Sequence, residues 1–317
     1  MRVIITGARG MLASAIRAEW AVSRPQDEVM GLSRVEVDLR DPDATLAKFE
    51  EIKPDLVVHC AAKVGGIAAN VAHPVTFLSE NLLLDTSVIG SSVAAGAKQF
   101  VYIGSSCMYP RDYRQPLVES DLLAAPLEPT NEGYAIAKIA GSKLCEYISR
   151  EHGLSYKTII PSNLYGPNDD YDSGKGHLVA AAISKMHRAK VDGASTVEIW
   201  GDGGARREFT YVEDLARWLV SDIDRIDAWP SMMNVGCGYD LSVREFYEIA
   251  RDVVGYGGEF VYDSSKPTGM HQKLMDSTIA KSFGWDPATD PSVGMARAYV
   301  EFLAESTSDT NSKERQR

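Results

Sequence analysis

The residues with the clearest chemical potential are Tyr134 and Lys138, which lie four positions apart in the run Tyr134-Ala-Ile-Ala-Lys138. Side chains at this spacing share one face of a helix, so the phenol and the ammonium would be neighbours. A nearby cation favours the phenolate and lowers the pKa of the phenol, which makes Tyr134 a usable proton donor or acceptor near neutral pH. A Tyr and a Lys that meet by chance on a protein surface can have the same spacing, so the pair alone does not identify a catalytic site. Ser105, at the end of an apolar strand upstream, completes a Ser, Tyr and Lys set and strengthens the interpretation.

Strands and helices must alternate along the first half of the chain to position these groups. Apolar runs predict buried strands, and longer segments between them predict helices. The predicted strands cover residues 2–6, 55–59, 100–104 and 156–160, and the helices about 10–20, 74–96 and 131–151. This order predicts an α/β protein with a mostly parallel, doubly wound sheet of the Rossmann type. Turn-forming residues between 163 and 176 predict a long loop.

A glycine-rich turn joins the first strand to the first helix, in the run Gly7-Ala-Arg-Gly10-Met11-Leu-Ala13. Glycines there let the backbone turn tightly and approach a pyrophosphate, while the helix N-terminus offers free N–H groups. The turn therefore predicts a dinucleotide-binding site that includes Gly7, Gly10 and Met11.

Two cations near this turn indicate which dinucleotide binds. Arg9 lies inside the turn, and Arg34 stands after the second strand, where an NAD enzyme usually has an acidic residue. Both would suit a 2′-phosphate, so NADP(H) is favoured over NAD(H), although two solvated arginines would look the same. Asp38, after an expected short strand, could accept from the adenine amine, and Ala61 and Ala62 leave room for the cofactor.

Composition narrows the range of partners and compartments. With 33 Lys plus Arg against 44 Asp plus Glu, the net charge of −11 argues against nucleic acid or an anionic membrane surface. There is no clean apolar span and no secretory signal pattern. Four cysteines without a CxxC pair and six histidines without metal-ligand spacing predict a reduced cytoplasmic protein without a bound metal.

Several motifs together resemble the GDP-L-fucose synthases, a family of short-chain dehydrogenases. The similarity runs from residue 1 to about 220 and is weaker afterwards. The matching motifs are Ala61-Ala-Lys-Val-Gly-Gly-Ile67, Gly104-Ser-Ser-Cys-Met-Tyr-Pro110, Glu128-Pro-Thr-Asn-Glu132, Tyr134-Ala-Ile-Ala-Lys-Ile-Ala-Gly141, Asn163-Leu-Tyr-Gly-Pro167, and Trp200-Gly-Asp-Gly203 with Arg207-Glu-Phe209.

The resemblance implies a domain plan and a reaction. A Rossmann domain would cover residues 1–162, with the chain returning to it around 208–238. A smaller, discontinuous α/β substrate-binding domain would cover 163–304, and a flexible tail 305–317. Family members are usually homodimers and convert GDP-4-keto-6-deoxy-D-mannose to GDP-L-fucose by epimerising C3 and C5 and then reducing C4 with NADPH.

The resemblance also assigns roles at the catalytic centre. Cys107 and His177 would exchange protons at C3 and C5, which the C4 ketone acidifies. Ser105 and Tyr134 would stabilise charge on the C4 oxygen. Tyr134 would then protonate that oxygen, while Lys138 holds the nicotinamide ribose. On local sequence alone, Cys107 fits a small core residue better, and nothing distinguishes His177 from the other histidines.

Further residues are candidates for binding the nucleotide sugar. Lys185, Arg207 and Lys273 carry cations that suit a diphosphate, and Lys185 stands where the family has a basic residue. Asn163 and Trp200 match positions in the family's substrate pocket. A core position is an equally good interpretation of Trp200.

Departures from the family leave the sugar less well defined than the chemistry at C4. Gly133 stands where the family has Pro, and Leu178-Val-Ala-Ala181 lacks the family's Pro. The C-terminal third, which helps to line the sugar pocket, differs most. A related GDP-sugar such as a heptose therefore stays open, as does an epimerase that performs no net reduction.

Three other classes fit less well. A 4,6-dehydratase would carry an acidic pair where Ser106-Cys107-Met108 stand. A UDP-hexose 4-epimerase lacks this cysteine and holds NAD permanently, against which Arg34 argues. A non-catalytic dinucleotide sensor would have no need of Ser105, Tyr134 and Lys138.

Overall fold

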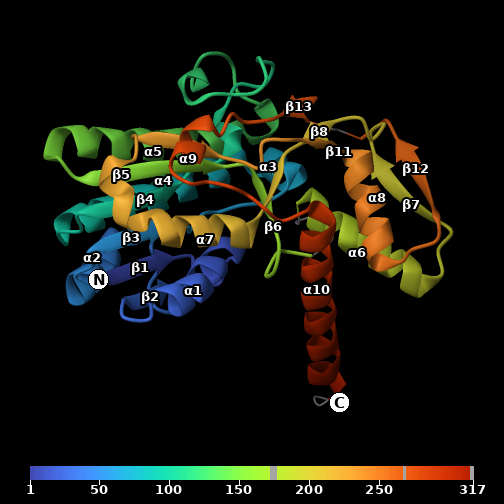
Figure 1. The fold of residues 1–317 in the computed structure, drawn as a ribbon, viewed down its shortest axis with the longest axis horizontal. Helices are drawn as coiled ribbons and strands as arrows, with labels where there is room; N and C mark the ends of the chain where they lie inside the picture. The colour runs from blue at the N-terminus through green and yellow to red at the C-terminus, as the bar shows by residue number, and fades with distance from the viewer. Residues whose placement is uncertain (172–176, 267–268, 315–317) are drawn as a thin grey trace.

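A parallel six-stranded sheet forms the centre of the larger part of the molecule (Figure 1). The computed structural model describes residues 1–171, 177–266 and 269–314, with the backbone alone described for 305–314. The strands follow the order β10-β5-β4-β3-β1-β2, and every pair in this sheet is parallel. Their bounds are β1 Arg2–Thr6, β2 Glu28–Leu32, β3 Leu56–His59, β4 Gln99–Ile103, β5 Ser155–Pro161 and β10 Met232–Val235. The sheet confirms the predicted fold class.

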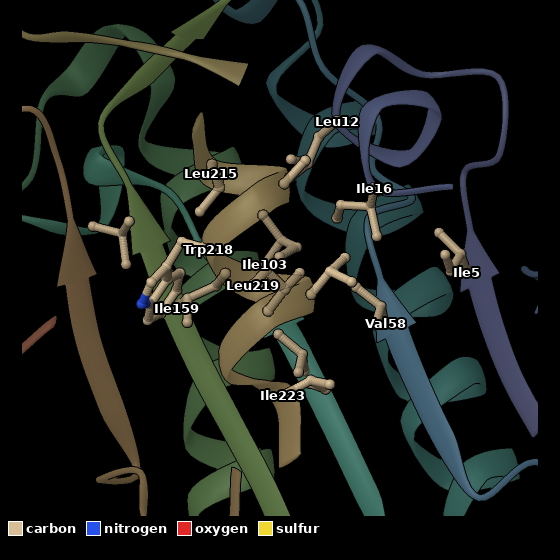
Figure 2. Close-up of a cluster of buried hydrophobic side chains, with 14 of the residues drawn as sticks. Ile5, Leu12, Ile16, Val58, Ile103, Ile159, Leu215, Trp218, Leu219 and Ile223 are labelled. Carbon is tan, nitrogen blue, oxygen red and sulfur yellow. The ribbon is translucent and has the colours of Figure 1, made fainter. Parts of the chain in front are cut away.

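Helices cover both faces of this sheet (Figure 1). α1 (Met11–Ser23) and α7 (Val212–Asp222) pack on one face, and α2 (Pro42–Ile52), α4 (Pro74–Ala94) and α5 (Glu132–His152) on the other. Because both faces are buried, the strands are continuous apolar runs rather than alternating ones. Val3 and Ile5 point toward α1 and α7, as Figure 2 shows for Ile5, while Ile4 points the other way.

A smaller part packs α6 (Leu178–Asp192), α8 (Val243–Val254) and α10 (Pro291–Glu314) around a second core. Its parallel pair is β7 (Thr196–Trp200) with β12 (Glu259–Asp263). β6 (Asn163–Tyr165) pairs with β9 (Phe209–Tyr211), where the chain passes toward α7 and β10. The remaining elements are α3 Ile67–Ala72, α9 Thr278–Ser282, and β8 Arg206–Arg207, which lies between β11 Leu241–Ser242 and β13 Gln272–Lys273.

Three segments differ from the sequence expectation. The loop expected from residue 163 begins instead with β6, because its first residues find β9 as a partner. Residues 34–40 form turns rather than a short strand. Residues 305–314, expected as a flexible tail, continue α10, which has no Pro or Gly after Gly294 to end it. Across the described residues, no helix is long and apolar enough to cross a membrane.

Candidate active site

Ser105 and Tyr134 lie side by side at the carboxyl end of β4. Ser105 follows β4 by two positions, Tyr134 lies in the first turn of α5, and the Ser105 hydroxyl is close enough to the phenol to act on its pKa. A 3-10 turn over Ser106–Met108 follows, and the Cys107 amide donates to Ser105 Oγ at 3.2 Å. This turn brings the Cys107 thiol close enough to Tyr134 to act on it electrostatically. The structure therefore gathers these three side chains at one point.

Two donors converge on the sulfur of Cys107. The Asn131 amide nitrogen lies 3.1 Å from Sγ, just before α5 begins. The Lys273 ammonium, from β13, lies 3.8 Å from the same sulfur and is 9% exposed. β13 pairs with β8 so that Lys273 stands opposite Arg207, whose guanidinium also acts electrostatically on Cys107. The sulfur thus faces positive charge and N–H donors, an environment that suits a proton-transfer group rather than an apolar core residue.

His177 joins the same group of side chains. It immediately precedes α6, and the Lys273 ammonium and the Asp170 carboxylate act on it electrostatically. Although the side chain is open to solvent on one side, the protein packed around the imidazole and the Lys273 ammonium hold its pKa below the ordinary value. A lowered pKa leaves the ring neutral near pH 7, so it can accept a proton.

The electrostatics of Tyr134 differ from the sequence expectation. Burial raises the pKa of its phenol, and the Cys107 thiol and Asp85 carboxylate add to the effect, while the Ser105 hydrogen bond opposes it. The Lys138 ammonium is directed at Asp85, at 3.8 Å. Spacing along α5 predicted the proximity of Lys138 but could not reveal a carboxylate on another helix that competes for its charge.

The glycine turn fits a dinucleotide phosphate. Gly7 has φ +69°, and a Cβ there would lie 2.9 Å from the Ala61 backbone after β3. Gly10 caps α1 without any side-chain hydrogen bond, and the first turn has no acidic residue. The N–H groups of the first turn, Met11 included, have no acceptor within the helix and can bind an anion. Gly10 and Ala62 are accessible at this end of the sheet.

The groups expected near the adenosine end are exposed. Arg9 and Arg34 are both open to solvent, and each faces a carboxylate: Arg9 acts on Glu36 and Arg34 on Asp38. Asp38 is paired with Arg40 at 2.8 Å, and this hydrogen bonding lowers its pKa to about 2. Two arginines with long, unburied side chains can turn toward a phosphate, and an Asp38 kept ionised can accept a hydrogen bond.

Of the remaining substrate candidates, Lys185 and Trp200 lie close together, and Asn163 makes a structural hydrogen bond. Lys185 donates to the Glu198 carbonyl at 3.2 Å and lies 5.7 Å from the ring of Trp200, which is 42% exposed. Trp200 is therefore a surface aromatic and not a core residue. Asn163 donates to the Glu208 carbonyl at 3.1 Å. Its side-chain amide therefore holds β6 next to the end of β8, where Arg207 lies.

Sequence reasoning missed Asn131, Asp85 and His59. Asn131 lies inside a matched motif, and only its contact with Cys107 reveals its place. Asp85 is a buried carboxylate in α4 and bonds to His59. Its signal was present in the sequence as an acidic residue in a helix that is otherwise apolar on most sides.

The described residues contain no group of three His, Cys, Asp or Glu side chains arranged to hold a metal ion. All four cysteines are free thiols. The side chains around Cys107 and Tyr134 offer acid–base and hydrogen-bonding chemistry, next to a turn that suits a dinucleotide.

Comparison with known proteins identifies what this arrangement resembles. Residues 3–236 match the family described as the NAD dependent epimerase/dehydratase family. A GDP-L-fucose synthase of Azorhizobium caulinodans is 42% identical over 95% of this chain and 96% of the relative. A GDP-L-colitose synthase of Yersinia pseudotuberculosis is also 42% identical, over 98% of this chain and 100% of the relative.

A solved structure of another enzyme of GDP-linked sugars is also similar to this chain. The GDP-mannoheptose C4 reductase of Campylobacter jejuni, determined with NADP bound, is 31% identical to this chain. Its TM-score is 0.86, and the match covers 95% of this chain and 98% of that one.

Proposed function

The chain belongs to the NAD dependent epimerase/dehydratase family, and we propose that it epimerises and reduces a GDP-linked 4-keto-6-deoxy sugar with NADPH, giving GDP-L-fucose or a close relative. The observation that carries the proposal is the meeting of Ser105, Cys107 and Tyr134 at one point, with His177 and Lys273 beside them. The names of the sequence relatives support the substrate class.

Epimerisation uses Cys107 and His177 as the two proton-transfer groups. One of them takes the proton from the carbon next to the ketone, and the bonding electrons move onto the C4 oxygen. The hydroxyl groups of Ser105 and Tyr134 donate to that oxygen and stabilise its charge. The other group returns a proton to the opposite face of the carbon, which restores the ketone with inverted configuration.

Reduction uses Tyr134 as the proton donor. NADPH supplies the hydride that forms the new C–H bond at C4. The phenol of Tyr134 gives its proton to the C4 oxygen, which becomes a hydroxyl group. The raised pKa of Tyr134 suits this direction, because the phenol is protonated before the step. The positive charge of Lys138 then stabilises the negative charge left on the phenolate.

Cofactor and substrate phosphates are bound at different places. Gly7, Gly10 and Met11 would hold the dinucleotide pyrophosphate, and Arg9 and Arg34 the 2′-phosphate of NADP(H). The NADP-bound relative supports this choice of cofactor. For the sugar nucleotide, the cations Lys185, Arg207 and Lys273 would bind the diphosphate, with Asn163 and Trp200 near the substrate.

We also propose that the protein forms a homodimer through α4 and α5. The outer face of α4 is an uncharged stripe of exposed residues, made of Val75, Ser79, Leu83, Thr86, Gly90 and Ala94. α5 packs against α4 and adds Ile136 and Tyr147, which are 42% and 46% exposed. A second copy would cover such a surface. The four free thiols accord with a reducing cytoplasm.

Incubation with GDP-4-keto-6-deoxymannose and NADPH in deuterated water tests the function. The expected result is oxidation of NADPH together with deuterium at C3 and C5 of the product. Deuterium without NADPH oxidation would identify an epimerase that performs no reduction. NADPH oxidation without deuterium would identify a reductase. If neither occurs, the substrate assignment is wrong, and GDP-heptoses are the next compounds to test because a relative reduces such a sugar.

A further inference from the structure

A buried polar network lies directly behind the catalytic lysine. Asp85 of α4 is 1% exposed and receives three partners: Tyr102 Oη at 2.5 Å, His59 Nε2 at 3.0 Å and Lys138 Nζ at 3.8 Å. Lys138 is itself 2% exposed and lies 4.4 Å from the centre of the Tyr102 ring. The ammonium is therefore held between a carboxylate and an aromatic face, both away from water.

The protonation of this network follows from its hydrogen bonds. The Ala61 amide donates to Thr6 Oγ1 at 3.1 Å, and Thr6 Oγ1 lies 2.7 Å from His59 Nδ1. Burial lowers the pKa of His59, so the ring is neutral. The Thr6 hydroxyl then donates to Nδ1, which leaves the Nε2 hydrogen for Asp85. His59 is thus a neutral donor that supports the carboxylate.

The carboxylate of Asp85 is ionised in this setting. Burial acts to raise its pKa, but the Lys138 ammonium and the hydrogen bonds from His59 and Tyr102 outweigh it, and the pKa lies below the ordinary value. Lys138 and Asp85 then form a buried ion pair of zero net charge. Such a pair is stable only where further hydrogen bonds satisfy the carboxylate, as His59 and Tyr102 do here.

The other titratable groups around the pair stay neutral. Cys60, after β3, has its pKa raised to about 12 by burial, and burial also raises the pKa of Cys145 on α5. The phenol of Tyr102 on β4 is raised in the same way, and so is that of Tyr134 on α5. The charge of Asp85 is therefore the one that these groups and the lysine experience.

The packing makes room for this arrangement. Tyr102 reaches Asp85 past Gly141 of α5, where any side chain would collide with the Tyr102 ring and hydroxyl. Gly141 follows Lys138 by three positions, so the turn of α5 that carries the lysine also carries the gap for the tyrosine. Residues from β1, β3, β4, α4 and α5 contribute to the network.

We propose that Asp85 is a positioning residue for the reduction: it anchors the Lys138 ammonium and keeps the Tyr134 phenol protonated, in the state that donates a proton to the ketone oxygen. A carboxylate near a group that can lose a proton makes that loss less favourable. Asp85 thereby extends to higher pH the range in which the enzyme reduces its substrate. This inference rests on the proposed function.

Asp85→Asn tests the proposal, because it keeps the shape of the side chain and removes its charge. The alkaline limb of the pH profile of kcat for NADPH-dependent reduction should move about one to three pH units lower. Tyr102→Phe is the matched control: it removes a hydrogen bond from the same carboxylate without changing the charge, and its alkaline limb should stay in place. Asp85→Glu restores the charge and should restore the limb. An unmoved limb in Asp85→Asn would overturn the proposal.

A second readout separates this proposal from the function itself. With [ζ-¹³C]tyrosine labelling, the NMR signal of Tyr134 can be assigned by its loss in Tyr134→Phe and titrated without substrate. Because the Asp85 carboxylate contributes to the raised pKa of this phenol, Tyr134 should lose its proton at lower pH in Asp85→Asn than in the wild type. The same titration in both proteins refutes the role of Asp85. A shifted titration without any ketone reduction refutes the proposed function instead.

Failure of Asp85→Asn to fold would still be informative. The double variant Asp85→Asn/Lys138→Met removes both members of the ion pair, which should restore folding because no unpaired charge remains buried. If the double variant is as unstable as the single one, Asp85 fills space and satisfies donors without serving Lys138, and the proposal fails.

Discussion

The Lys273 ammonium lies 3.8 Å from the sulfur of Cys107, although 166 positions of sequence separate the two residues. It also acts on His177, the other proposed proton-transfer group. One cation thus acts on both of the residues that would exchange protons with the sugar. Its removal should therefore affect epimerisation in a way that loss of phosphate binding alone would not.

Lys273→Met should slow epimerisation and change its pH dependence. Because a neighbouring cation lowers the pKa of an imidazole, removing the ammonium raises the pKa of His177. The acidic limb of deuterium incorporation should therefore move to higher pH. Lys98→Met, at an exposed site, is the control. A rise in KM with no movement of the limb would show that Lys273 serves the diphosphate alone.

Cys107→Ser should separate the two halves of the reaction. An alcohol exchanges protons with carbon far less readily than a thiol, so deuterium incorporation at the affected carbon should fall by about a hundred- to ten-thousandfold. Reduction of the unepimerised ketone should continue, since Ser105 and Tyr134 are untouched. Cys237→Ser, whose thiol donates to the Tyr239 carbonyl at 3.2 Å, is the matched control. Normal deuterium exchange in Cys107→Ser would disprove the assignment.

Local patterns predicted most of the large sheet. The strand at 2–6 has the bounds expected from its apolar run, and α4 and α5 begin within a residue of the expected positions. These elements are buried on broad faces, so their residue types carry a strong signal. β6 and the turns at 34–40 lack that signal. A strand as short as β6 forms only where it finds a partner elsewhere in the chain, and local residue types do not reveal that partner.

The site was predictable only in part, for the same physical reason. Ser105, Cys107 and Tyr134 are fixed by one strand end and one helix start, and motifs record such short-range geometry. The partners of Cys107 and Lys138 come from β13 and α4, far away in sequence. The expected fall in the pKa of Tyr134 assumed that Lys138 acts on the phenol, whereas burial, the Cys107 thiol and the Asp85 carboxylate raise that pKa.

Arg34→Asp should change the preference between cofactors. If Arg34 binds the 2′-phosphate, its loss removes a charge-assisted hydrogen bond, and the affinity for NADPH should fall by about ten- to a hundredfold. Affinity for NADH, which has no such phosphate, should fall less or rise. Fluorescence titration of both nucleotides measures the ratio, and Arg188→Asp, an exposed arginine on α6, controls for the change in net charge. An unchanged ratio would show that Arg34 is a solvated surface residue that does not bind the 2′-phosphate.

Gly7→Ala should impair cofactor binding more than it lowers stability. At φ +69° an alanine costs about 1–2 kcal/mol, and its Cβ would in addition lie 2.9 Å from the Ala61 backbone. Gly96→Ala is a close control, because Gly96 has φ +83° with nothing within 4 Å of a Cβ. Both variants should lose stability from backbone strain, Gly7→Ala the more so because of the added clash, and only Gly7→Ala should lose NADPH affinity as well. Equal affinities would mean that the turn does not hold the dinucleotide.

Glu208→Gln should weaken the dependence of stability on pH. Glu208 is 1% exposed and accepts from the Gly238 and Met275 amides, and burial raises its pKa to about 7. The folded protein therefore keeps a proton that the unfolded chain has lost above its lower, ordinary pKa. Stability from this group is present at low pH and is lost as pH rises toward 7, by up to about 3 kcal/mol.

Urea unfolding of both proteins at intervals from pH 5 to pH 8 measures this dependence. The glutamine has no proton to lose, so the difference in unfolding free energy between variant and wild type should move in favour of the variant as pH rises. Its amide nitrogen also faces a backbone donor, which lowers stability by a constant amount and leaves the trend intact. Asp192→Asn, at an exposed site, should run parallel to the wild type. A parallel curve for Glu208→Gln would show that Glu208 is ionised in the folded protein throughout this range.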